Sequence, residues 1–132
     1  MAHRLADQAD AIARSYFSTA AIGARTKSDG SPVTDADREI EIALRSLIRQ
    51  EYPDDAFIGE AFGAHGHGRR RWIIDAIDGT ASFLAGEPEW STLIAVEEDG
   101  RVSARWPSRF SRISTPHSTG TCSWPSWKAR KR

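Results

Sequence analysis

The spacing of apolar residues predicts an amphipathic helix near the start of the chain. Over residues 3–18, apolar side chains recur every three or four positions, at Leu5, Ala9, Ile12 and Tyr16. Charged and polar residues fill the positions between them, which is the pattern of a helix with one buried face. Glycines and a proline interrupt this pattern over residues 19–33, so we expect a loop there.

A second amphipathic helix is predicted between the loop and Pro53. Thr34 or Asp35 can cap its start, and the early acids Asp35 and Asp37 suit the positive end of the helix dipole. Its apolar stripe consists of Ile40, Leu44, Leu47 and Ile48. Because proline disfavours helical backbone in the residue before it, the helix should end near Tyr52.

Short apolar runs predict strands after Pro53. They comprise residues 56–58, 72–74 and 90–96, and their composition favours buried strands. The Asp-Gly pair at residues 99–100 is typical of a hairpin turn, so a further strand should begin at residues 101–102. Thr80 is a suitable N-cap for a short helix through residues 82–84.

The charge of the chain is zero overall but divided unequally along it. Residues 1–100 carry all 18 acidic residues and 10 of the 18 basic ones, whereas residues 101–132 carry 8 basic residues and no acid. From about Ala104 neither helical nor strand periodicity is present. This composition favours translation in a non-native reading frame over residues 105–132, and a genuine basic tail that binds nucleic acid is the less favoured alternative.

Cysteine usage and hydropathy bound the cellular setting. The single cysteine, Cys122, excludes an intramolecular disulfide and is consistent with a reducing cytosol. No apolar run approaches the roughly 18 residues of a membrane span. We therefore expect a cytoplasmic protein with no membrane partner.

The candidate chemistry lies in residues 72–80, where an apolar run is followed by acids. Asp75 is expected where the strand leaves the sheet, and Asp78 on the next turn. Carboxylates at a strand end suit hard cations such as Mg²⁺, and free amides at a helix start suit phosphate. Glu60 repeats this arrangement after the strand of residues 56–58. The alternative is plain turn chemistry, in which the aspartates cap backbone amides.

Three motifs in order resemble the inositol monophosphatase family of Mg²⁺-dependent, lithium-sensitive phosphomonoesterases. They are residues 27–38 (KSDGSPVTDADR), 57–60 (FIGE) and 72–80 (WIIDAIDGT). Residues 61–63 and 90–95 are similar to the bacterial histidinol-phosphatase branch. The resemblance covers residues 3–104.

The resemblance implies a role for several residues. The metal ligands it implies are Glu60, Asp75, Asp78 and the main-chain carbonyl of Ile77. The amides of Gly79 and Thr80 would receive the substrate phosphate. Asp37 and Thr80 would orient or activate the attacking water, with Glu60 in the same catalytic set, and Lys27 would lie in a loop that closes over the site.

The resemblance also implies the fold class and the division of the chain. We expect an α+β fold, the N-terminal half of a layered sugar-phosphatase-type sandwich with two helices on an antiparallel sheet. This domain would span residues 1–104, and residues 105–132 would be a basic tail of low order. The family's C-terminal half has no counterpart in residues 105–132, so the family unit is expected to be truncated.

The expected activity is Mg²⁺-dependent hydrolysis of a small phosphate ester, such as histidinol phosphate in histidine biosynthesis or inositol monophosphate. Truncation should impair it, and two substitutions weaken the match: Ala61 replaces a second glutamate, and Ala76 replaces a proline that would stiffen the turn. The alternative is a non-catalytic fragment of the same family. The expected partner is the phosphate ester, nucleic acid is disfavoured, and a homo-oligomer stays open.

Overall fold

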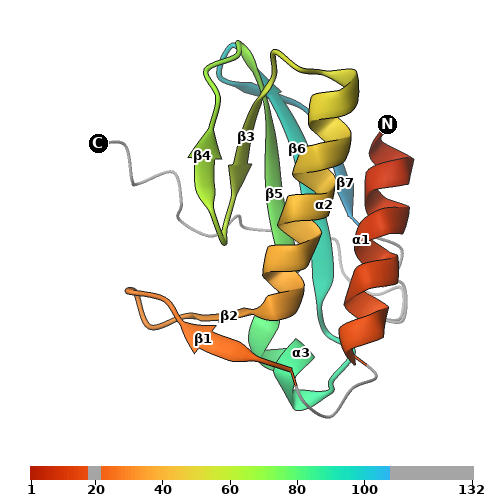
Figure 1. Ribbon diagram of the computed structural model, residues 1–132, viewed down its shortest axis with the longest axis vertical. Helices are drawn as coiled ribbons and strands as arrows, with labels where there is room; N and C mark the ends of the chain where they lie inside the picture. The colour runs from red at the N-terminus through yellow and green to blue at the C-terminus, as the bar shows by residue number, and fades with distance from the viewer. Residues whose placement is uncertain (18–21, 108–132) are drawn as a thin grey trace, which may run out of the picture.

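Two helices cover one face of a five-stranded sheet in the computed structural model, which describes residues 1–17 and 22–107 (Figure 1). Helices α1 (Ala2–Phe17) and α2 (Asp35–Glu51) lie side by side, and each begins within one residue of the start that the sequence predicted. None of the described helices is long and apolar enough to cross a membrane.

The sheet is mixed, which corrects the antiparallel sheet expected from the sequence. Its strand order is β4-β3-β5-β6-β7. The strands are β3 (Ala56–Gly59), β4 (Gly63–His65), β5 (Arg70–Asp78), β6 (Ser91–Glu98) and β7 (Arg101–Pro107). Three neighbouring pairs are antiparallel, but β3 and β5 are parallel because the chain turns back through β4 before it enters β5. The expected α+β class is confirmed.

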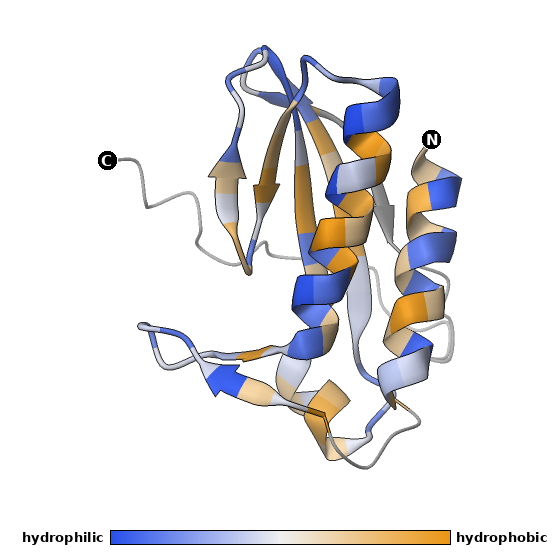
Figure 2. Cartoon of the chain, in the orientation of Figure 1, coloured by the Kyte–Doolittle hydropathy of each residue, from blue (hydrophilic) through white to orange (hydrophobic). Residues whose placement is uncertain are grey.

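The core lies between the two helices and the sheet. Its buried members on the helices are Leu5, Ala9, Ile12, Ala13, Ala36, Ile40, Leu44 and Ile48. The sheet contributes Phe57, Trp72, Ile74, Ile94 and Val96. Figure 2 shows hydrophobic stretches in β3, β5 and β6, whereas the loops at the upper end of the sheet are hydrophilic. The stripes seen in the sequence are therefore the buried faces of both helices.

Helix α2 begins with a capping box. The N-cap is Thr34, whose hydroxyl accepts a hydrogen bond from the Asp37 amide at 3.2 Å. The Asp37 carboxylate accepts in return from the amide and the hydroxyl of Thr34, both at 2.7 Å. This reciprocal arrangement satisfies orphan donors at the helix start and fixes the Asp37 side chain, which is 2% exposed.

A small hairpin occupies part of the segment expected to be a loop. Strands β1 (Ala24–Thr26) and β2 (Pro32–Thr34) are antiparallel, and a backbone hydrogen bond from the Lys27 amide to the Ser31 carbonyl oxygen closes the tip. Each strand has only three residues and β1 is fully exposed, so neither shows the alternation that predicts a strand from sequence. The hairpin projects beside the lower end of the sheet (Figure 1).

Strand β5 continues further than the sequence indicated. Asp75 still pairs with Leu93, and Asp78 pairs with Ser91, with a register shift between them. Ala76 and Ile77 are both fully buried, which breaks the alternation of a regular strand. Asp75 therefore lies within β5 and Asp78 ends it, and the expectation that the strand stops at Asp75 was wrong.

The N-cap of helix α3 (Thr80–Ala85) is Gly79, and not Thr80 as was expected from the sequence. Gly79 has φ +88°, and a Cβ there would collide with the Glu89 carbonyl oxygen. A left-handed backbone with another backbone segment this close requires glycine. Because Gly79 is the cap, Thr80 becomes the first helical residue.

Three aromatic rings hold α3 against the rest of the fold. Phe17 at the end of α1 lies 5.5 Å from Phe83 and 5.7 Å from Trp90, measured between ring centroids. Phe83 and Trp90 meet edge to face at 5.0 Å, a geometry that is favourable beyond simple burial. The cluster ties α3 to the start of β6.

The predicted hairpin between β6 and β7 is confirmed. Asp99 and Gly100 both have positive φ, 51° and 78°, as a two-residue type I′ turn requires. Strand β7 continues to Pro107, past Ala104, where the sequence loses its periodicity. The rest of the predicted basic tail, residues 108–132, lies outside the described residues.

We predict that Thr34→Ala lowers the free energy of unfolding by about 1–2 kcal/mol, because the substitution removes the cap of α2 and the hydroxyl donor to Asp37. Urea denaturation followed by circular dichroism measures the loss. Ser28→Ala, on the exposed hairpin tip, is the control and should change stability by less than about 0.5 kcal/mol. Equal effects of the two substitutions would contradict the capping role.

Candidate active site

The predicted site residues meet where the parallel strands β3 and β5 run side by side. Gly59 at the end of β3 pairs with Ile74 in β5. The next residues along these strands are Glu60 and Asp75, and in a parallel pair they advance in the same direction. The topology therefore brings two acids that are 15 positions apart in the sequence to the same place.

Asp75 is at the electrostatic centre of this place. Burial, followed by the negative charges of Glu60, Asp78 and Asp37, raises the pKa of Asp75 to about 8. A hydrogen bond between the carboxyl groups of Asp75 and Glu60 favours the protonated form as well. The Oδ1 atom of Asp75 is buried without a hydrogen-bond partner. A carboxylate in this position needs a proton or a cation.

The negative charge of Glu60 also acts on Asp78 and Asp37. Burial raises the pKa of Asp78, and the charge of Glu60 adds to this effect. Burial also raises the pKa of Asp37, although the hydrogen bonds from Thr34 oppose the change. Asp75 therefore lies among three acids, Glu60, Asp78 and Asp37, whose negative charges all disfavour its ionisation.

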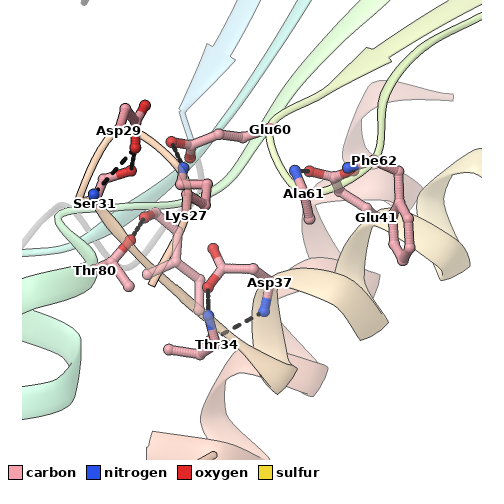
Figure 3. A network of polar contacts seen from close by, with 11 residues as sticks. Lys27, Asp29, Ser31, Thr34, Asp37, Glu41, Glu60, Ala61, Phe62 and Thr80 are labelled. Atoms are coloured by element: carbon pink, nitrogen blue, oxygen red, sulfur yellow. Dashed lines mark hydrogen bonds and ion pairs between the residues drawn. The ribbon is translucent and has the colours of Figure 1, made fainter. Parts of the chain in front are cut away.

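Lys27 brings a positive charge to the cluster from the β1–β2 hairpin. Its ammonium group forms an ion pair with the Glu60 carboxylate (Figure 3). The side chains of Lys27 and Glu60 are 20% and 45% exposed, and an ion pair with a partner this exposed contributes only about 0–1 kcal/mol. The hairpin tip thus lies against Glu60, and the closure of this loop over the site stays a prediction.

The donor set fits a hard divalent cation, because carboxylate oxygens are the ligands that Mg²⁺ prefers and Asp75 holds a buried oxygen without a partner. Within residues 1–17 and 22–107, however, no three His, Cys, Asp or Glu side chains are arranged to hold an ion. The structure therefore brings Glu60, Asp75 and Asp78 into electrostatic contact, and their convergence on one ion stays a prediction.

The turn after β5 carries the other predicted site residues. The hydroxyl of Thr80 donates a hydrogen bond to the Ile77 carbonyl oxygen at 2.8 Å, so two of these residues contact each other directly. Gly79 lies between Asp78 and the start of α3. The acids and the helix start thus lie within a few residues of one another.

Glu41 is a buried acid beside this cluster that the sequence interpretation did not identify. It is 1% exposed, and its carboxylate accepts hydrogen bonds from the amides of Ala61 and Phe62. Burial raises its pKa to about 7. One signal was available: Glu41 follows Asp37 by four positions, so both acids lie on the same face of α2.

Comparison with known proteins finds a matching family model and several similar sequences. The sequence model of the inositol monophosphatase family matches residues 1–104. A Streptomyces griseus protein named glucose-1-phosphate thymidylyltransferase is 50% identical over 111 residues, which are 83% of this chain and 42% of that protein. A histidinol-phosphatase of Streptomyces coelicolor is 44% identical over 98 residues, which are 74% of this chain and 37% of the relative.

A solved structure agrees with the sequence matches. An inositol monophosphatase from Zymomonas mobilis is 44% identical, with a TM-score of 0.61, over 78% of this chain and 39% of its own. The chain thus spans about two fifths of the length of the relatives that it matches. The α+β architecture described above is the arrangement shared with these proteins.

We predict that, without metal ions, the folded protein loses stability as the pH rises through neutrality. Burial raises the folded-state pKa of Asp75 from 3.8 to about 8, so the folded state keeps a proton that the unfolded chain has released. The contribution is complete below about pH 4 and is lost as the pH passes about 8. Glu41, with its pKa raised from 4.5 to about 7, adds to the same trend.

Melting temperatures recorded in EDTA between about pH 5 and about pH 8.5 test this prediction. The decrease should be smaller in Asp75→Asn, because the amide cannot ionise. Asp7→Asn, an equivalent change at an exposed position of α1, should retain the wild-type slope. An Asp75→Asn slope equal to that of the wild type would show that Asp75 is not the group responsible.

Proposed function

Because this chain belongs to the inositol monophosphatase family, we propose that its acidic site serves metal-assisted hydrolysis of a small phosphate monoester. The observation that carries the proposal is the juxtaposition of Glu60 and Asp75, which follow the paired residues Gly59 and Ile74 of two parallel strands. An acid whose pKa is raised to about 8, first by burial and then by neighbouring acids, is typical of a functional site.

The residues proposed to hold Mg²⁺ are Glu60, Asp75, Asp78 and the main-chain carbonyl of Ile77. When bound, the ion would neutralise charge on the phosphate oxygens and make water a stronger nucleophile. The unpartnered Oδ1 of Asp75 and the hard oxygen donors around it support this assignment. The Ile77 carbonyl accepts the Thr80 hydroxyl, which orients that carbonyl beside the acids.

The remaining residues of the site are proposed to position the reactants. Asp37 and Thr80 would orient the attacking water. The capping box holds the Asp37 carboxylate in place, and burial raises its pKa, which makes it a better proton acceptor. Gly79 and Thr80 would present backbone amides to the phosphate. Lys27, on the hairpin tip against Glu60, would close over the site.

The proposed substrate is the phosphate ester of a small polyol or amino alcohol, such as inositol monophosphate or histidinol phosphate. The relatives named for these substrates are both 44% identical to the chain. The relative named as a thymidylyltransferase carries the name of a different reaction, but the family model that matches residues 1–104 describes phosphatases. We therefore favour hydrolysis as the reaction. We also propose that the protein is cytoplasmic.

A second candidate is a non-catalytic member of the family. The chain spans about two fifths of its relatives' length, and within residues 1–17 and 22–107 no three acids, histidines or cysteines form a finished metal site. These observations favour impaired catalysis by these 132 residues on their own.

We predict weak, Mg²⁺-dependent release of phosphate from histidinol phosphate or inositol monophosphate by the purified chain. A missing metal charge removes transition-state stabilisation of several kcal/mol. The turnover should therefore be at least about a hundredfold below the typical value of about 10 per second. Phosphate release with excess Mg²⁺ and with EDTA measures it.

Matched variants separate the two candidates. Asp75→Asn should abolish the Mg²⁺-dependent release, and Asp7→Asn should leave it unchanged. Turnover near 10 per second would refute impaired catalysis, and release that is unaffected by Asp75→Asn would refute the assignment of the site. A complete absence of release, with the protein folded, would favour the non-catalytic candidate.

We also propose that residues 1–104 are the family unit and that residues beyond β7 contribute little to its stability. The family match ends at residue 104, and the sequence after it has no pattern that would bury a face. A chain shortened after Pro107 should melt within about 2 °C of the full chain, since surface-level changes shift stability by less than about 0.5 kcal/mol. A large fall in melting temperature would refute this division.

A further inference from the structure

Glu41 contacts the backbone on the C-terminal side of Glu60. Its carboxylate accepts the amide hydrogens of Ala61 at 2.5 Å and Phe62 at 3.2 Å. Figure 3 shows Glu41 reaching from α2 to both amides, while Glu60 extends from the same turn toward Lys27. The two amides directly follow Glu60, so these hydrogen bonds restrain the backbone on one side of it.

Glu41 also restrains the backbone on the N-terminal side of Glu60. A Cβ atom at Gly59 would collide with the Glu41 carboxylate, so the acid lies directly against the last residue of β3. Gly59 itself is held by pairing with Ile74 in β5. Glu41 therefore touches the chain immediately before and after Glu60, without using the Glu60 side chain.

Burying the Glu41 carboxylate costs folding free energy, and no cation among the described residues pairs with it. Burial is the main cause that raises its pKa, and the two amide hydrogen bonds oppose this shift. Within residues 1–17 and 22–107, the hydrogen-bond partners of Glu41 are these two amides, and no cation is among them. A buried carboxylate that is held only by backbone donors costs stability that an apolar residue of similar size would not.

We propose that Glu41 is a positioning residue, which holds the turn of residues 59–62 so that Glu60 faces Asp75. The inference rests on the proposed function only in naming Glu60 as a metal ligand. Groups behind the direct ligands commonly orient them in this way.

The test compares Glu41→Gln with Glu39→Gln in the full chain. Gln has the same shape, but its NH₂ group is a donor and cannot replace the carboxylate oxygen that accepts from one of the two amides. Glu39 is on the same helix, exposed, and bonded to the Tyr16 hydroxyl instead. Mn²⁺, counted by electron paramagnetic resonance, should bind Glu41→Gln about tenfold more weakly than wild type. Its affinity for Glu39→Gln should stay within about twofold.

A double-substitution cycle distinguishes positioning from general stabilisation. If Glu41 acts through Glu60, Glu41→Gln should have no further effect on Mn²⁺ affinity in a Glu60→Gln background. Unchanged affinity in folded Glu41→Gln, or an equal loss in both backgrounds, would overturn the proposal. If Glu41→Gln does not fold, Glu41→Asp, which keeps the charge but shortens the reach, is judged by the same criteria.

Amide hydrogen exchange gives a readout that does not depend on metal. The amides of Ala61 and Phe62 should exchange faster in Glu41→Gln, and those of α1 should not. If the wild type binds no Mn²⁺, the proposed function fails on its own, and exchange then decides the role of Glu41. Selective loss of protection at the two amides would support it, and unchanged protection would overturn it.

Discussion

The repulsion among carboxyl groups beside the parallel pair β3 and β5 is the constraint on which the rest of the site depends. Asp75 bears most of it, because burial and three neighbouring acids all disfavour its charged form. A proton, the ammonium group of Lys27 or a divalent cation can each relieve this repulsion. Positive charge is therefore stabilised among these acids, as the proposed metal-assisted hydrolysis requires.

The fold holds these acids in place through their backbones. The capping box fixes Asp37 at the start of α2, and the register of β3 and β5 sets Glu60 beside Asp75. The register shift in β5 carries the chain to Asp78 and into α3. Apolar packing of both helices on the sheet holds these backbone segments together against the repulsion, since burial in the core is the main source of stability.

Local sequence patterns predicted the elements well and their junctions poorly. Both helices and the turn at residues 99–100 were predicted correctly, and Thr34 was one of the two cap candidates, because each feature depends on side chains close in sequence. The predicted end of β5 and the predicted cap of α3 were wrong. A register shift decides where β5 ends, and the approach of Glu89 to Gly79 decides the cap of α3. The parallel pairing of β3 with β5 was missed because strand pairing joins residues that are distant in the sequence.

The sequence by itself determined which residues could carry the chemistry: the acids of three short motifs, with a glycine and a threonine at a helix start. Only the tertiary structure decided how these acids affect one another. The pairing of Gly59 with Ile74 makes Glu60 and Asp75 neighbours, and the packing of α2 brings Glu41 against the same turn. The physical reason is that pKa shifts depend on distance and burial in space, which the order of residues along a chain does not contain.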